Sequence, residues 1–220
     1  MPERIARLAA ASVFFFSLLG AAASAAGPRA DSFVRLTALE DRAEKIADGA
    51  QSDAEARTEA AQVVSGWPVV RSDFAAERAA RWSLTAVDGE VAALRSASDL
   101  SALERAANET TGALAPLFEL AGDTVPVSVR LFDYLERSIA LDARDGDWAR
   151  AEADGATLER TWVTLRPLVL QHHGQAAAAA ADRSVAVVEA ALHARNAAHV
   201  VAGTHRSGGA FGMLEKVFRS

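Results

Sequence analysis

Residues 147–169 read DWARAEADGATLERTWVTLRPLV, and residues 52–74 read SDAEARTEAAQVVSGWPVVRSDF. When the earlier stretch is displaced by about 95 residues, Trp67 falls on Trp162 and Arg71 on Arg166. The same displacement, without a gap, aligns Val34, Arg35, Leu36 and Arg42 with Val129, Arg130, Leu131 and Arg137. We interpret this pattern as a duplicated helical unit.

Both stretches place apolar or small residues at alternating steps of three and four, which is the spacing of one face of an α-helix. In the second stretch the stripe comprises Trp148, Ala151, Gly155, Leu158, Trp162, Leu165 and Val169. A stripe this narrow is typical of nearly parallel helices that pack in bundles. Pro68 and Pro167 are expected to kink or end their helices, because proline lacks the backbone donor.

The same periodicity extends along the rest of the chain. It predicts helices at about 32–48, 84–96, 100–121, 127–143 and 175–202, and two more that begin at residues 52 and 147. A short last helix is predicted around Phe211, Leu214 and Phe218. Residues 122–126 (GDTVP) form a clear break. We therefore predict an all-α protein with two related halves, residues 27–122 and 123–220, which either dock side by side or merge into one bundle.

Residues 1–26 have the pattern of a cleaved signal peptide. Arg4 and Arg7 precede an apolar core, residues 8–19 (LAAASVFFFSLL), and small residues at 23–26 provide a cleavage site. The alternative is an uncleaved N-terminal anchor, although the apolar run is shorter than the roughly 20 residues of a membrane span. We expect an exported protein of a bacterial periplasm that has no membrane span after cleavage.

Composition narrows the classes of partner. The chain has no cysteine, which excludes disulfides and thiol chemistry. Its formal net charge is −6, and no block of lysine or arginine interleaves with aromatic residues, so a nucleic-acid partner is not expected. The expected partner is another exported or inner-membrane protein.

Trp67, Arg71, Trp162 and Arg166 are the first candidate site residues. An arginine four residues after a tryptophan lies on the same helix face, where it can cover the ring and reach a carboxylate. One interpretation is an anion or carboxylate-ligand site in each half. The other is an aromatic core anchor whose arginine ties it to a neighbouring helix.

Histidines occur only in the second half, and they provide the candidate metal ligands Glu189, His193 and His199. Glu189 and His193 are four residues apart and share a helix face, and such a pair can bind iron, copper or zinc. The alternative is a solvated polar face, with His199 half-buried against another helix. His172 and His173 are either cationic residues at a helix end or further metal ligands.

No Gly-x-Ser-x-Gly motif and no phosphate-binding glycine loop occurs in the chain. By analogy of architecture, an exported, duplicated bundle without cysteine resembles periplasmic helper proteins of metal uptake, which implies a transition-metal ion as the cofactor or ligand. We expect a non-enzymatic binding or accessory protein. The alternatives are an interaction module without a small ligand and a helical enzyme with a His/Glu acid–base pair.

Overall fold

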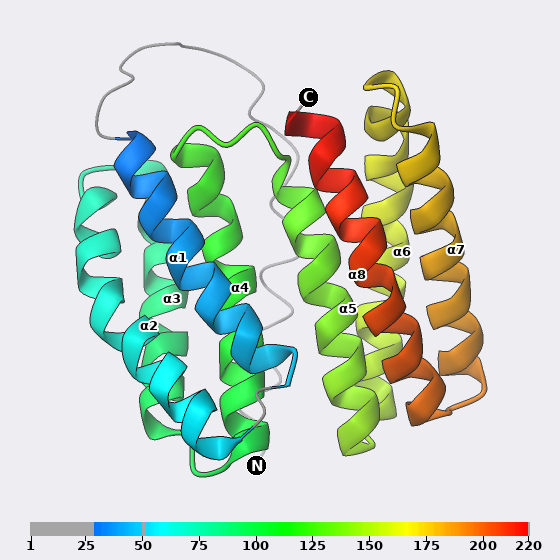
Figure 1. Ribbon diagram of the computed structural model, residues 1–220, viewed down its shortest axis with the longest axis horizontal. Coiled ribbons are helices and arrows are strands. Elements are labelled where there is room, and N and C mark those ends of the chain that lie inside the picture. The colour runs from blue at the N-terminus through cyan, green and yellow to red at the C-terminus, as the bar shows by residue number, and fades with distance from the viewer. Residues whose placement is uncertain (1–28, 50–51, 220) are drawn as a thin grey trace.

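A computed structural model of the protein describes residues 29–49 and 52–219. At residue 29 and at residues 205–208 it describes the backbone but not the side chains. The predicted signal peptide lies outside the described residues. Within them the chain is helical, without strands, which confirms the all-α prediction (Figure 1). The helices are α1 (Arg29–Ala47), α2 (Asp53–Asp73), α3 (Arg81–Ser96), α4 (Leu100–Leu120), α5 (Val127–Asp145), α6 (Trp148–Gln171), α7 (Gln175–His193) and α8 (Ala197–Arg219), with a 3-10 turn, η2 (Arg78–Ala80), before α3.

The helices form two groups of four, which we call the first bundle (α1–α4) and the second bundle (α5–α8). Within each bundle, consecutive helices pack side by side, and the fourth helix packs against the first, α4 against α1 and α8 against α5. The two bundles meet where α4 lies against α5 (Figure 1). Each helix of the second bundle begins 94 to 98 residues after its counterpart in the first.

Capping residues define several of the helix starts. Ser52 accepts a hydrogen bond from the backbone N–H of Glu55 at 3.2 Å, and Asp99 accepts one from Ala102 at 2.9 Å. Such caps satisfy backbone donors that have no partner within the helix. At the other end, Gly146 closes α5 with φ of 77°, a left-handed conformation that glycine adopts without a steric penalty.

Each bundle has its own apolar core. The core of the first bundle draws its buried residues from Leu36 to Ala121, and the core of the second draws them from Val125 to Phe218. Trp67 and Trp162 are 3% and 5% exposed and lie in the two cores respectively. The ring of Trp162 makes an edge contact with Phe132, with the ring centroids 5.9 Å apart.

The prediction of one helix over residues 175–202 is wrong. The chain breaks after α7, where Arg195 adopts φ of 45° and the N–H of Asn196 donates to the carbonyl of Ala191. The side chain of Asn196 then caps α8 by accepting from the N–H of His199 at 3.1 Å. The sequence has no glycine at this break, because Arg195 adopts the left-handed conformation that glycine usually adopts at the end of a helix. Gly203, just after the predicted end, and residues 208–209 lie within α8.

Pro68 and Pro167 also lie inside continuing helices, α2 and α6, so neither helix ends at its proline. Gly155 has a packing reason: a Cβ there would lie 2.6 Å from Cδ1 of Leu192. The missing side chain therefore makes room for the Leu192 side chain of α7 against α6. None of the helices in the described part of the chain is both long enough and apolar enough to cross a membrane.

Candidate functional site

An aspartate in the first bundle joins the buried Trp67 to Arg71 at the surface. Nε1 of Trp67 donates to Oδ1 of Asp88 at 2.8 Å, and Nε of Arg71 donates to the two oxygens of the same carboxylate at 3.0 and 3.1 Å. Asp88 belongs to α3, whereas the other two residues belong to α2. The three side chains therefore connect neighbouring helices.

The second bundle repeats this arrangement between α6 and α7. Nε1 of Trp162 donates to Oδ1 of Asp182 at 2.8 Å, and Nε of Arg166 donates to both oxygens at 2.9 and 3.2 Å. The hydrogen bond from Arg166 holds the pKa of Asp182 below its usual value. In both bundles the carboxylate that the arginine contacts is the protein's own. The geometry therefore favours the interpretation of these residues as core anchors over an external anion site.

The candidate metal ligands lie at the junction of α7 and α8. Glu189 is partly buried in α7, His193 is its exposed last residue, and His199 is exposed in the first turn of α8. The expectation of a half-buried His199 is wrong, because α8 starts just before it and turns its side chain to solvent. Among the side chains that the structure describes, no group of three or more histidine, aspartate or glutamate residues is arranged to hold a metal.

His172 and His173 follow α6 and are exposed. The ring of His172 lies against Phe218, with the ring centroids 4.9 Å apart. His173 adopts φ of 59° in the turn before α7. These contacts fit residues that end a helix and pack against α8.

The interface between the bundles holds most of the buried charge. Arg130 of α5 is bound by Glu40 of α1 at 2.5 Å and by Asp123, in the connection between the bundles, at 2.6 Å. Its guanidinium carbon lies 3.6 Å from the centroid of the Phe118 ring, a cation–π contact. Burial raises the pKa of Glu40 to about 8, although Arg130 opposes the shift. Two carboxylates thus share one buried cation.

Arg137 is the centre of a second group at this interface. It bonds Glu44 of α1 at 3.1 Å and Asp133, one turn earlier on α5, at 2.6 Å, and it lies 3.6 Å from Asp48. Its Nε donates to Oδ1 of Asn108 on α4 at 3.1 Å. Burial raises the pKa of Asp133 to about 7 and also raises the pKa of Glu44, against the effect of Arg137. Carboxylates again outnumber the cation.

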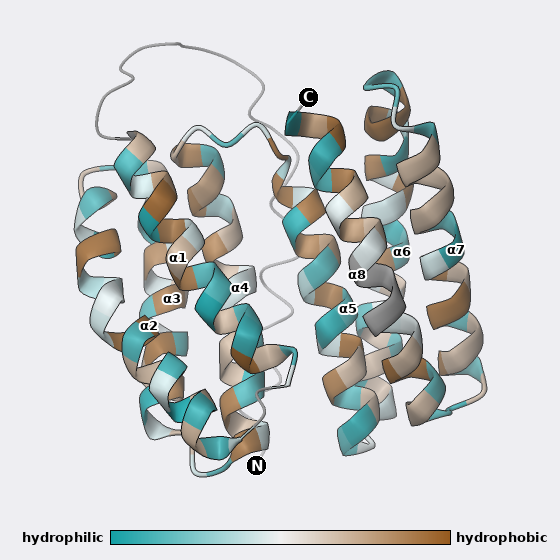
Figure 2. Ribbon diagram, viewed as in Figure 1, coloured by the Kyte–Doolittle hydropathy of each residue, from teal (hydrophilic) through white to brown (hydrophobic). Residues whose placement is uncertain are grey.

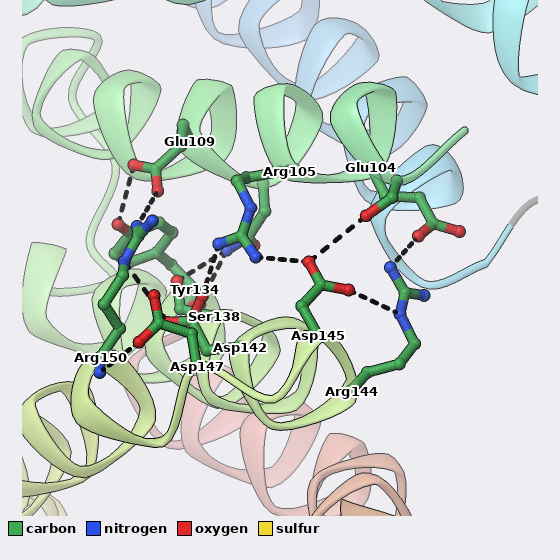
Figure 3. A network of polar contacts seen from close by, with 12 residues as sticks. Glu104, Arg105, Glu109, Tyr134, Ser138, Asp142, Arg144, Asp145, Asp147 and Arg150 are labelled. Atoms are coloured by element: carbon green, nitrogen blue, oxygen red, sulfur yellow. Dashed lines mark hydrogen bonds and ion pairs between the residues drawn. The ribbon is translucent and has the colours of Figure 1, made fainter. Parts of the chain in front are cut away.

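A third polar network joins α4, α5 and the start of α6 (Figure 3). Arg105 of α4 bonds Asp142 at 2.5 Å and Asp145 at 2.8 Å. Tyr134 donates to Glu109 at 2.9 Å. Asp142 is fully buried, and among the described side chains its Oδ2 is the one buried polar atom without a hydrogen bond. Arg150 is 3.8 Å from that oxygen.

Acidic residues around this network have raised pKa values. Burial, together with the charge of Glu109, raises the pKa of Glu90 to about 7. Burial also raises the pKa of Asp154 to about 6, with Asp142 and Glu109 adding to the shift. These groups come from α3, α4, α5 and α6, so the excess of negative charge extends across both bundles.

A cavity of about 220 Å³ opens where the bundles meet, and we call it the inter-bundle cavity. Its walls come from the end of α1, from α5 and from α8. Polar and apolar residues alternate along α5 and α1 in this region (Figure 2). Five charged residues line the cavity: Asp48, Asp133, Glu136, Arg137 and Arg144. Arg144 is paired with Glu104 of α4, and Glu136 accepts a hydrogen bond from Ser184 at 2.6 Å.

The cavity residues were not singled out as candidates from the sequence. Arg130 and Arg137 were visible there only as the repeat partners of Arg35 and Arg42. The earlier two arginines lie on the outside of α1 and pair with Asp73 and Glu59. Burial of the later two depends on the packing of the first bundle against α5, for which the sequence pattern provides no signal.

Comparison of the chain with models of protein families, with curated proteins and with solved structures finds no match.

Proposed function

We propose that the chain is an exported, non-enzymatic binding or accessory protein, and that the inter-bundle cavity takes a small organic cation. The observation that carries the ligand proposal is the cavity itself, whose charged walls come from both bundles. The N-terminal pattern of Arg4, Arg7 and residues 8–19 supports export to the periplasm. The lack of nucleophile and phosphate-loop motifs in the sequence supports a role without catalysis.

We also propose that the two bundles arose by duplication. The similar offset of all four helix starts supports this origin. The Trp67–Asp88 and Trp162–Asp182 hydrogen bonds, both 2.8 Å long, support it independently, because each lies between the second and third helix of its bundle.

The charge around the cavity determines the expected ligand. Arg144 is paired with Glu104, and Arg137 contacts the carboxylates of Glu44, Asp48 and Asp133, so acids outnumber the cation in this group of described side chains. Excess buried carboxylates are relieved either by protonation or by a bound cation. At about 220 Å³ the cavity is smaller than the roughly 300–1,000 Å³ of typical ligand pockets, so the ligand is expected to be small. An amine that donates several hydrogen bonds fits these walls.

The metal-linked form of the proposal rests on Glu189, His193 and His199. It has no support from the described side chains, since none of them forms a three-ligand group. Isothermal titration with iron, copper and zinc salts tests it directly. Unchanged metal affinity in a Glu189→Ala, His193→Ala double variant would remove this site.

Calorimetry and thermal shift with putrescine and spermidine as probes test the cavity. The expected result is saturable binding that weakens about tenfold or more in Asp133→Asn and in Glu136→Gln, because each removes one negative charge near the amine. Glu152→Gln is the matched control, since Glu152 is exposed on α6 and pairs only with Arg195 among the described residues. Absence of binding, or equal weakening in the control, would refute the cavity as an amine site.

Localisation has its own test. Expression of the full chain in a bacterium, followed by fractionation and N-terminal sequencing, is expected to yield a periplasmic protein that begins near residues 26–28. Recovery of the unprocessed chain in the cytoplasm would contradict export.

A further inference from the structure

Trp82 is the most exposed large hydrophobic side chain that the structure describes, at 86%. It lies in the first turn of α3. Trp67 and Trp162, by contrast, are buried, and Trp148 is partly buried. A tryptophan ring in water lacks the favourable free energy that burial of its apolar surface would provide. The exposure of Trp82 therefore does not stabilise the fold, and we look for a binding role.

The residues around Trp82 form a small surface, residues 75–82, which we call the α2–α3 tip. Ala75, Ala76 and Ala79 are exposed there, and so are Arg78 and Arg81. Within the described residues neither arginine makes an ion pair, and Glu77 is the one acid of the tip. Cations at the start of a helix oppose its dipole, so these arginines do not stabilise α3. The tip therefore combines apolar and cationic groups at some expense of stability.

The tip lies at the end of the first bundle where α1 begins. Arg35 near the start of α1 forms an ion pair with Asp73 at the end of α2, at 2.9 Å. The start of α1 and the connection from α2 to α3 thus lie at the same end of the first bundle (Figure 1). Exposed Val34 and Val69, at 65% and 52%, extend the apolar surface of this end.

We propose that the α2–α3 tip docks on a membrane surface that contains anionic lipid. Tryptophan is favoured at the membrane–water interface, where its ring meets the acyl boundary and its N–H meets the headgroups. Arginines beside it are attracted to anionic headgroups. The small alanines allow the tip to approach the headgroups closely. The overall net charge of −6 makes a local cationic surface selective, because the remaining surface is repelled.

Tryptophan and arginine also dominate contacts between proteins, so a protein partner is the competing occupant. Trp82, Arg78 and Arg81 are all exposed on one short connection, and neither arginine has an ion-pair partner among the described residues. An exposed indole beside two such cations matches the acyl boundary and the headgroups of an anionic bilayer, which favours a lipid surface.

Vesicle flotation with the chain from Ala26 onward tests the proposal, because this chain keeps all eight helices and both cores. The vesicles are phosphatidylcholine with and without phosphatidylglycerol, at low and at high salt. We expect binding to the anionic vesicles only, accompanied by a blue shift of tryptophan emission. Trp82→Ala and the double variant Arg78→Glu, Arg81→Glu are each expected to lower partitioning by about tenfold. The charge reversal suits the helix dipole, so these variants are expected to fold.

Val163→Ala and Arg160→Glu, exposed positions on α6, are the controls and are expected to leave partitioning unchanged. Equal binding to neutral and anionic vesicles, no binding to either, or equal losses in the controls would overturn the proposal. Self-association that Trp82→Ala abolishes, without vesicle binding, would also overturn it and would assign the tip to a protein contact.

Discussion

Nε1 of Trp162 donates a 2.8 Å hydrogen bond to Oδ1 of Asp182 on the neighbouring helix. The tryptophan is 5% exposed and Asp182 is partly exposed, so one carboxylate satisfies a buried donor and also reaches an arginine at the surface. Trp67 and Asp88 are related in the same way in the first bundle. This relationship predicts how substitutions at the two aspartates differ.

Asp182→Ala is expected to lower the free energy of unfolding by about 1–3 kcal/mol, because it leaves the buried indole N–H without an acceptor. Asp182→Asn keeps an acceptor and loses only the exposed ion pair with Arg166, so its cost is expected to stay below about 1 kcal/mol. Urea unfolding at neutral pH measures both. Equal costs for the two variants would show that the ion pair, and not the indole bond, is the stabilising contact.

The carboxylate of Asp182 also determines how the stability of the protein is expected to change in acid. Arg166 lowers the folded-state pKa of Asp182 below the value in the unfolded chain. The contribution of Asp182 to the free energy of unfolding is therefore present above its unfolded pKa and is lost as pH falls through its folded pKa. The stability difference between the wild-type protein and Asp182→Asn is expected to disappear in strong acid, which urea unfolding at a series of pH values would show.

Arg137→Met is expected to destabilise the protein by about 3–5 kcal/mol, because Asp133 and Glu44 would remain at the bundle interface without their cation. Adding Asp133→Asn is expected to recover part of the loss. Arg42→Met is the matched control 95 positions earlier, where the arginine side chain is 38% exposed beside Glu59. Its expected cost is below about 1 kcal/mol. Similar costs for Arg137→Met and Arg42→Met would contradict the assigned burial.

The raised carboxyl pKa values predict that stability falls as pH rises from about 4 to about 8. Glu40, Asp133 and Glu90 have folded pKa values of about 8, 7 and 7, above their ordinary values of 4.5, 3.8 and 4.5. The folded state thus binds more protons than the unfolded chain, so stability is greatest below the unfolded pKa values and declines until pH exceeds the folded ones. We expect a loss of at least about 2 kcal/mol between about pH 5 and about pH 8.

Glu90→Gln isolates one of these groups. It is expected to stabilise the protein by about 1 kcal/mol at about pH 8 and by much less at about pH 5, allowing for screening of the exposed part of the side chain. Thermal unfolding at both pH values measures the difference. A pH-independent effect would exclude titration of Glu90 as the cause.

Gly155→Ala is expected to destabilise the protein, although alanine favours a helix by about 1 kcal/mol over glycine. A Cβ at Gly155 would lie 2.6 Å from Cδ1 of Leu192, so the leucine side chain would have to leave its present position in the core. Gly89→Ala in α3 is the control, because nothing lies within 4 Å of its Cβ position. That variant is expected to gain about 1 kcal/mol. Chemical unfolding of both variants checks the contrast, and a gain in both would refute the close approach.

Much of the helical architecture could be read from the chain. The three-and-four spacing around Trp67 and Trp162 located α2 and α6, because an amphipathic face has to be buried for a helix to be stable. The starts predicted at residues 52 and 100 agree with α2 and α4, which Ser52 and Asp99 cap, because side-chain caps act within a few residues of sequence. The end of α7 was missed, because arginine took a left-handed position that glycine usually signals.

The sequence by itself determined the helices, their apolar faces and the equivalence of the tryptophans, since these depend on local spacing. Only the tertiary structure decided which residue of each pair aligned by the 95-residue displacement is buried. The side chain of Arg35 on α1 is 39% exposed, whereas that of Arg130, 95 positions later on α5, is 4% exposed. The physical reason is that the first bundle covers α5 on a face whose counterpart on α1 remains open to solvent. That packing buries Arg130 and Arg137, gathers their carboxylates and forms the inter-bundle cavity.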